Sequence, residues 1–182
     1  KFISIVTLLC STIVLLLIIN SNEIIYVVLG PRWAESSKIF LILGVAAIVQ
    51  PLYGTFGLVL IALGQYKKYS SWGRYNALII IPSFLIGINF NLEIFAICYV
   101  IANYITFFFS AFYVFKNTPI NVFLFFKKTI PLLLWLCLFA IIVITFVDID
   151  INVLLLLIVK TTLFLGMSII YTLYFFKERK FI

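Results

Sequence analysis

The sequence contains no histidine and only six acidic residues among 182. Histidine and paired carboxylates are the usual general acids and bases of enzymes, so their scarcity argues against a catalytic site. The phosphate-binding pattern GxxxxGK[ST] is also absent, so this chain is not expected to bind ATP. No loop is long enough to hold the clustered acids or arginines of a membrane glycosyltransferase or polymerase. We therefore expect no catalytic residues, no enzyme activity and no cofactor.

Cysteine is scarce as well: Cys10, Cys98 and Cys137 stand singly inside apolar runs. Because they form no CxxC pair and no other metal-ligand spacing, they are interpreted as small core or lipid-facing residues. The closest pair of acids, Asp148 and Asp150, flanks a predicted two-helix turn, where solvated charge is ordinary. No metal site is predicted.

What the chain has in excess is apolar residues, which make up 65% of it and give a mean hydropathy of +1.28. A soluble domain is only about half apolar. The apolar runs are continuous over about 20 residues, the length that a helix needs to cross the hydrocarbon layer. Strands of a membrane β-barrel would instead alternate apolar and polar residues. The predicted fold class is therefore all-α integral membrane.

Six transmembrane helices are predicted. The shortest is the third, which contains Pro82, and it forms a tight helical hairpin with the fourth. The predicted spans are residues 2–28, 39–63, 75–88, 92–115, 129–147 and 151–176.

The net charge of +7 comes from lysines and arginines in the loops between these spans, so we reject nucleic acid as a partner and expect membrane lipids instead. Basic residues stay preferentially on the cytoplasmic side of a membrane. Ten of them fall on one side of the six-span arrangement, whereas Arg32 and Lys38 fall on the other with five of the six acids. This alternation predicts that both ends of the chain are cytoplasmic. The ten basic residues are Lys1, Lys67, Lys68, Arg74, Lys116, Lys127, Lys128, Lys177, Arg179 and Lys180.

The chain divides into three parts. Residues 1–116 form a four-helix part, and residues 117–128 form an inner connection that could lie on the membrane surface as an interfacial helix. Residues 129–182 add two helices and a cytoplasmic tail. Because the chain begins at Lys1 and enters an apolar run at once, the start is interpreted as a cut through a longer protein.

Polar side chains inside the spans are costly in lipid and are candidates for a substrate path. Gln50 and Tyr53 surround Pro51, Asn76 lies one turn inside the third span, and Asn103 lies in the middle of the fourth. They could contact sugar hydroxyls in a hydrophilic cavity, or they could hydrogen-bond between helices as in many bundles.

Two basic residues, Arg74 and Lys160, could likewise have either a functional or a structural role. Arg74, at the cytoplasmic mouth of the third span, could grip a phosphate, or it could anchor the helix on anionic headgroups. Lys160 is the only full charge deep in a span. It is a functional candidate by default, although lysine can also snorkel to the interface. The aromatic residues of the fourth span are interpreted mostly as lipid contacts and not as a ligand site. They are Tyr104, Phe107, Phe108, Phe109, Phe112, Tyr113 and Phe115.

A polar turn at residues 29–35 joins the first two spans. Gly30 and Pro31 break the helix there, and Trp33 is typical of a membrane–water interface. The second span then carries Pro51, Gly54 and, at its end, Gly64, a pattern of a broken helix. Such breaks are tolerated where neighbours or a wet cavity satisfy the freed carbonyls, and they often line transporter sites.

These residues resemble the polysaccharide transporter family of bacterial flippases, and the closest branch is the colanic-acid-exporter type. The family is part of the multidrug/oligosaccharidyl-lipid/polysaccharide exporter superfamily. The resemblance covers about residues 24–104, with Leu29, Gly30, Pro31, Trp33 and Pro51 in its motifs. The similar segments are VLGPRWA at residues 28–34, ILGVA at 42–46, QPL at 50–52, ALGQ at 62–65, SWGRYN at 71–76, SFLIG at 83–87 and AICYVIAN at 96–103.

The resemblance implies a two-lobe transporter of about fourteen helices, of which this chain would be the last six, working by alternating access. Its substrate would be an undecaprenyl-diphosphate-linked oligosaccharide for O-antigen, capsule or exopolysaccharide synthesis. It would reside in the bacterial inner membrane, as a monomer when full length. The N-terminal lobe of the same chain would be missing here, so the isolated 182 residues are not expected to transport. A membrane enzyme of glycan assembly and a small-molecule exporter of the same superfamily remain as alternatives.

Overall fold

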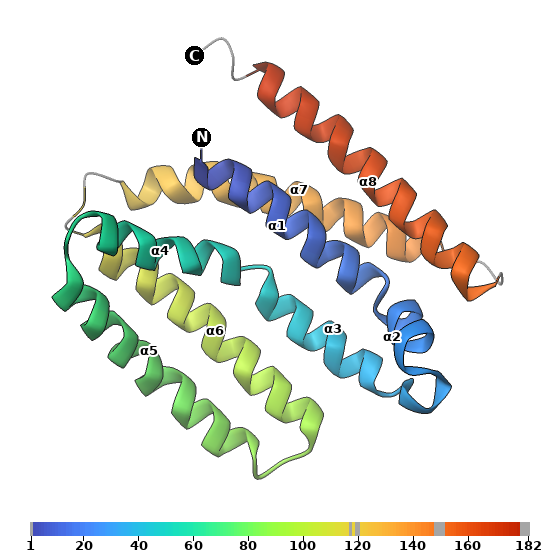
Figure 1. Ribbon diagram of the computed structural model, residues 1–182, viewed down its shortest axis with the longest axis horizontal. Coiled ribbons are helices and arrows are strands. Elements are labelled where there is room, and N and C mark those ends of the chain that lie inside the picture. Colours follow the sequence, from blue (N-terminus) through green and yellow to red (C-terminus); the bar gives the residue numbers. More distant parts are fainter. Residues whose placement is uncertain (1, 117, 119–120, 148–151, 179–182) are drawn as a thin grey trace.

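A computed structural model describes residues 2–116, 118, 121–147 and 152–178, and it describes side chains within 5–116, 118, 121–145, 147 and 152–173. In this part of the chain all regular structure is helical, so the all-α prediction is confirmed (Figure 1). The elements are α1 (Phe2–Ile19), α2 (Ser21–Leu29), the 3-10 helix η1 (Pro31–Trp33), α3 (Ser36–Ala47), α4 (Gln50–Ala62), α5 (Tyr66–Gly87), α6 (Leu92–Phe115), α7 (Val122–Phe146) and α8 (Val153–Glu178).

Four helical segments of the described residues are long and apolar enough to cross a membrane: 36–62, 92–115, 122–145 and 153–173. A fifth is added if the bent pair α1 and α2 counts as one span. α5 is not among them, because Lys67, Lys68 and Arg74 make its first half polar. Four to five such helices are compatible with a multi-pass membrane protein, whereas the count of six stays a prediction.

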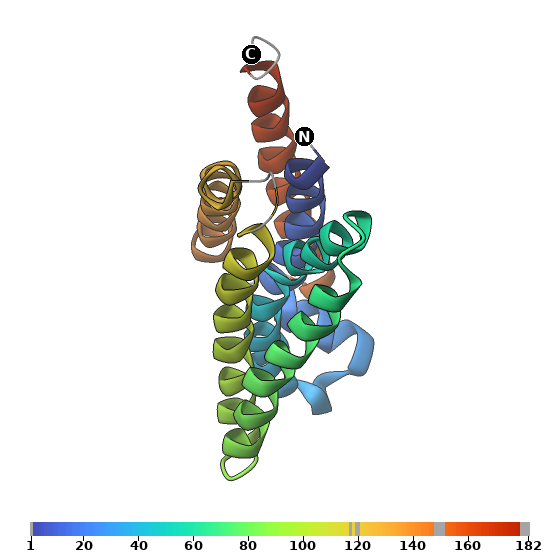
Figure 2. The same ribbon diagram turned by 90° about the vertical axis from the view of Figure 1, so that its left-hand side faces the viewer.

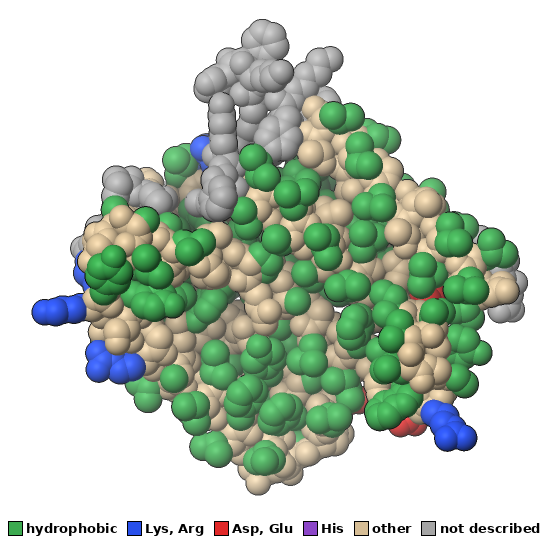
Figure 3. All heavy atoms as spheres, viewed as in Figure 1, with side chains coloured by type: hydrophobic (Ala, Val, Ile, Leu, Met, Phe, Trp, Pro, Cys, Tyr) green, Lys and Arg blue, Asp and Glu red, His purple; other side chains and the backbone are tan. Residues whose placement is uncertain are grey.

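Hydrophobic side chains are distributed over the whole described part of the face drawn in Figure 3, and lysine and arginine lie at its margins. Exposed hydrophobic residues include Leu78 at 69% and Ile170 at 70% of their full exposure. A surface of this kind fits lipid better than water, because soluble proteins rarely expose large contiguous apolar patches. The outer surface thus agrees with the composition of the helices.

The first predicted span is bent. α1 and α2 meet at an angle of 71° around Asn20, where a single run over residues 2–28 was predicted. The Asn20 side chain donates a 2.9 Å hydrogen bond to the Leu16 carbonyl. The Leu16 carbonyl also accepts the Asn20 backbone N–H at 3.2 Å, so the side chain shares this acceptor with the helix ladder at the bend. The continuous-helix prediction was therefore wrong at this point.

The second predicted span is broken as expected, at Ile48 and Val49, just before Pro51 in the first turn of α4. Val49 N–H bonds to the Ala46 carbonyl at 3.3 Å, so Val45 O does not receive its usual partner. The Tyr104 hydroxyl, on α6, donates to Val45 O at 3.1 Å. A neighbouring helix thus satisfies a carbonyl exposed by the break, as required inside a membrane.

The predicted hairpin between the third and fourth spans is present as α5 and α6. The Asn91 side chain caps α6 by accepting a 2.9 Å hydrogen bond from Ile94 N–H. A Cβ on Gly87 would come within 3.0 Å of the Phe95 Cα, so glycine permits the close approach of the two helices. α6 has the predicted bounds, but α5 begins at Tyr66 rather than at residue 75.

α7 also begins earlier than predicted, at Val122 rather than at residue 129. The Asn121 side chain caps it by accepting a 2.8 Å hydrogen bond from Phe123 N–H. Residues 122–128, assigned above to the inner connection, therefore form the first turns of α7.

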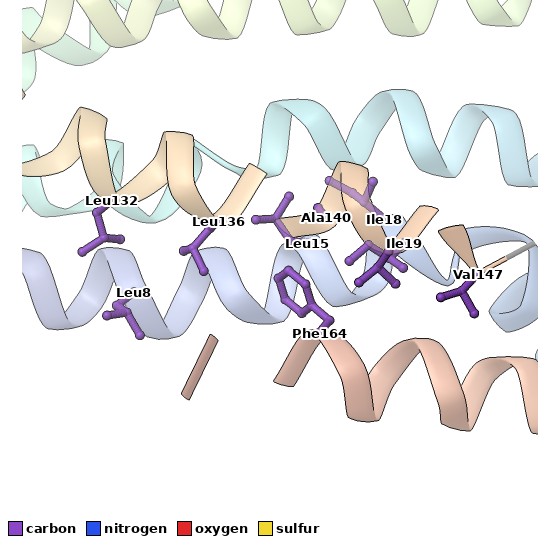
Figure 4. Close-up of a cluster of buried hydrophobic side chains, with 10 residues drawn as sticks. Leu8, Leu15, Ile18, Ile19, Leu132, Leu136, Ala140, Val147 and Phe164 are labelled. Carbon is purple, nitrogen blue, oxygen red and sulfur yellow. The ribbon is translucent and has the colours of Figure 1, made fainter. Parts of the chain in front are cut away.

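Two apolar clusters hold the helices together. One joins α4, α5, α6 and α7, with Phe56 stacked on Phe107 at a centroid distance of 5.7 Å. The other joins α1, α7 and α8 (Figure 4), where the fully buried Phe164 of α8 packs beside Leu15 and Ala140. The α5–α6 hairpin and α8 lie at opposite ends of the molecule in Figure 2.

Candidate functional site

A buried ion pair joins the last helix to the first bend of the chain. Lys160 Nζ, on α8, donates to Glu23 Oε1, on α2, at 2.6 Å. The Lys160 side chain is 11% exposed and the Glu23 side chain is 6% exposed. This is the only salt bridge among the described residues. Intramembrane ionisable residues pair with one another because an isolated charge is costly there.

The fold brings these two residues together through the bend at Asn20. If α1 continued straight, Glu23 would lie further along its axis, but the bend turns α2 so that it packs against α3 and α8 (Figure 1). On α8, Lys160, Phe164 and Ser168 recur every four residues, and all three are buried. Residues four apart share one helix face. α8 thus meets the bundle through one stripe that contains an ion pair and an apolar contact.

Beside the pair lies an open cleft of about 230 Å³ between α2, the start of α3 and the start of α8. Its walls are mostly apolar. Glu23 Oε2 is buried and accepts no hydrogen bond from the described residues, and the same holds for Asn20 Oδ1 at the bend. The lining residues are Asn22, Glu23, Tyr26, Ala34, Ser37, Val153 and Leu156.

A second polar cluster lies among α4, α5 and α6. The Trp72 indole N–H donates to Ser110 Oγ at 2.7 Å, and Ser110 Oγ donates to Asn76 Oδ1 at 3.3 Å. The Tyr53 ring packs on Trp72 at 5.0 Å. All but Tyr53 are buried. The structure therefore brings the predicted residues Asn76 and Tyr53 together, and Asn76 makes the interhelical hydrogen bond that was the simpler alternative.

The remaining polar candidates differ in exposure. Gln50 Nε2 donates to the Tyr99 hydroxyl at 3.2 Å, an exposed contact between α4 and α6. Asn103 donates to the Tyr99 carbonyl of its own helix at 3.0 Å. Arg74 is exposed and bonds to Ser71 Oγ at 3.0 Å. Gln50 and Tyr99 thus offer hydrogen-bonding groups on a surface, whereas the Asn103 amide N–H is used locally.

The glycine positions of the motif have identifiable backbone roles. Gly30 has a φ of +88° and ends α2, and Gly64 has a φ of +68° between α4 and α5. Left-handed φ values favour glycine, so the turns flanking the broken span need it. Gly54 has no such role, because its φ is not positive and a Cβ added there would meet no atom within 4 Å. Trp33 is 56% exposed in η1, and it contributes nothing to either apolar cluster, while Leu29 and Pro31 flank the same turn.

The aromatic residues of α6 divide into two sets. Phe107 and Phe115 are buried in the α4–α7 cluster, whereas Phe108 and Phe112 are exposed. Phe107 and Phe115 are therefore core residues, whereas lipid contact stays a prediction for the exposed set.

Within the described ranges no three residues among histidine, cysteine, aspartate and glutamate gather into a metal-binding group. Asp148 and Asp150 lie outside the described residues.

Sequence reasoning singled out Lys160 but not its partner. Glu23 was assigned to the polar end of the first span, and only the polar run at residues 20–23 inside an apolar stretch pointed to it. Trp72, Ser110 and Tyr99 were not predicted as site residues either, because nothing in the local sequence distinguishes their side chains from others of the same type. Comparisons with protein-family models, with curated proteins and with solved structures find no match for this chain.

Proposed function

We propose that this chain is part of a flippase that moves an undecaprenyl-diphosphate-linked oligosaccharide across the bacterial plasma membrane. The support is the ordered series of motif segments over residues 24–104 together with the break between α3 and α4 within one span. The break is the observation that carries the proposal, because discontinuous membrane helices are a recurrent feature of transporter sites.

The proposed mechanism is alternating access. α3 and α4 act as the flexible element, since Gly30 and Gly64 flank them and the ladder is interrupted at Val49. The exposed Gln50–Tyr99 pair faces the sugar, and Arg74 binds a phosphate of the diphosphate, for which the guanidinium fork is suited. In this proposal the protein makes no covalent change in the substrate.

The basic residues are distributed unequally between the two ends of the helices, as expected for a membrane protein. In Figure 1 the α4–α5 turn and the start of α7 lie on one side, whereas η1 and the start of α8 lie on the other. The exposed Lys67, Lys127 and Lys128 belong to the first side, and Arg32 and Lys38 to the second. The first side is proposed to be cytoplasmic because it has the larger number of basic residues.

The test is deletion of the gene in its source bacterium, followed by analysis of surface glycan and of extracted lipid-linked intermediates. Loss of a flippase is expected to remove the surface polymer and to accumulate the lipid-linked unit inside the cell. A plasmid copy is expected to restore the polymer, and a copy with Arg74→Ala to restore it less well than one with Lys38→Ala. Single glycan units that still reach the surface without long chains would contradict the proposal and indicate a polymerase.

A further inference from the structure

We propose that the Glu23–Lys160 pair is an exchange site at which a small monovalent metal cation replaces the ammonium proton of Lys160. The geometry is that of a carboxylate with one oxygen bound to Lys160 Nζ at 2.6 Å and the other turned to no described partner. That carboxylate lines a cleft that opens to the surface. The role of this pair as the ion site of a transporter rests on the proposed function. The exchange of the proton for a cation can be measured without any transport.

The charge balance of a buried site dictates the exchange. Lys160 and Glu23 together are neutral, and an extra cation beside them would leave an uncompensated buried charge, which is strongly unfavourable. Neutrality is kept if Lys160 loses one proton as the cation binds. The reaction is Lys160-NH₃⁺·Glu23-COO⁻ + M⁺ → Lys160-NH₂ + Glu23-COO⁻·M⁺ + H⁺. The proton leaves through the cleft to water, and no covalent bond to carbon changes.

The oxygen ligands fit a monovalent rather than a divalent ion. Only one carboxylate is present, and the other oxygens near it are neutral: Ser37 and Asn22 line the same cleft, and Asn20 lies at the bend three residues before Glu23. Divalent ions usually recruit several carboxylates or keep substrate phosphates. Among the described residues, no three acidic, cysteine or histidine side chains are placed so that together they could hold a metal ion.

The side chain on α8 suits this role because lysine can release its ammonium proton, whereas arginine stays protonated in proteins. Lys160 lies on the buried stripe with Phe164, which holds the helix against α1 and α7. The lysine can therefore move away from Glu23 while Phe164 keeps α8 in contact with the bundle.

No other titratable or charged group among the described residues takes the place of Lys160 beside Glu23. Tyr26 lines the cleft from α2, and the charged groups of the η1–α3 segment are exposed, so none of them replaces Lys160 as the buried counter-ion. The groups on these two helices, on the elements packed against them and on the η1–α3 turn are Cys10, Tyr26, Arg32, Glu35, Lys38, Lys127, Lys128, Cys137 and Tyr171, and the two lysines of α7 are exposed.

The test uses the whole 182-residue chain in lipid nanodiscs, in weakly buffered solution with a pH indicator. Sodium chloride replaces N-methylglucamine chloride at constant ionic strength, and lithium and potassium chloride follow in separate titrations. We expect saturable release of about one proton per chain, since one lysine supplies it. Absence of release from the unaltered chain, or equal release with every salt including N-methylglucamine chloride, would overturn the proposal.

Three variants sharpen the result. Glu23→Gln removes the charged ligand and Lys160→Arg removes the releasable proton, so each is expected to abolish the release. Lys38→Arg, an exposed lysine on α3, is the matched control and should release as the unaltered chain does. Each variant is first shown to be folded by its circular dichroism. Release that persists in folded Lys160→Arg would also overturn the proposal, whereas failure of the gene-deletion test would leave this measurement unaffected.

Discussion

The Trp72 indole N–H donates a 2.7 Å hydrogen bond to Ser110 Oγ, and both side chains are buried between α5 and α6. In lipid, as in a protein core, a buried donor without an acceptor is costly. Loss of this one hydrogen bond is therefore expected to destabilise the α5–α6 hairpin, because the indole N–H would be left buried without an acceptor. It also orients Trp72 against Tyr53, one of the predicted substrate-path residues.

Ser110→Ala is expected to destabilise the chain by about 1–3 kcal/mol, because the indole N–H of Trp72 and the Asn76 carbonyl oxygen lose their shared partner. The measurement is the free energy of unfolding in mixed detergent micelles. Ser70→Ala, at an exposed position of α5, is the control and should change the stability little. Equal stability of the two variants would show that the network contributes nothing.

Gly44→Ala is expected to destabilise the packing of α3 on α1 by about 1–3 kcal/mol, as overpacked cores do. A Cβ at Gly44 would lie 2.6 Å from Ile18 Cγ1. Gly54→Ala is the control, since a Cβ there meets no atom within 4 Å. Adding Ile18→Ala to Gly44→Ala should cost less than the two changes measured separately. Strict additivity would contradict the predicted clash.

Tyr104→Phe removes the hydroxyl that satisfies Val45 O at the break between α3 and α4. A loss of about 1–3 kcal/mol is expected, because the carbonyl is left without a donor in an apolar setting. The exposed Tyr66, changed to Phe, provides the comparison in the same unfolding measurement. If both variants unfold alike, another group satisfies the carbonyl.

The proposed orientation predicts which cysteines a membrane-impermeant maleimide reaches. In a background without Cys10, Cys98 and Cys137, Arg32→Cys should be labelled from outside intact cells. Lys67→Cys should be labelled only after the membrane is opened, because its turn is predicted to be cytoplasmic. Both positions are exposed, so accessibility to water does not separate them. The reverse labelling pattern would invert the topology.

Patterns in the sequence predicted the features of the fold that are set by residues close together in the chain. α6 has the bounds expected from its apolar run, and the break before Pro51 lies where proline and glycine indicated it. The starts of α5 and α7 were missed because Lys67, Lys68, Lys127 and Lys128 interrupt the apolar pattern but not the helix. Hydropathy marks the part of a helix that lies in lipid, and helices continue beyond it.

The candidate sites depend on contacts that no local pattern contains. Glu23 and Lys160 are 137 residues apart in the chain, and Trp72 and Ser110 are 38 apart. Lys160 was noticed because a charge in an apolar helix is rare, but its partner depended on the 71° bend at Asn20. The polar run at residues 20–23 lies at this bend, but it specifies neither the angle nor the helices against which α2 packs.

The most direct test of the proposed function is flipping in proteoliposomes that contain the complete protein in which these residues occur. A lipid-diphosphate-linked sugar with a fluorescent label on the sugar is bleached by an impermeant reductant. We predict that nearly all label becomes accessible with the unaltered protein, and that Arg74→Ala slows this exchange relative to Lys38→Ala. An accessible fraction equal to that of protein-free liposomes would contradict the flippase proposal.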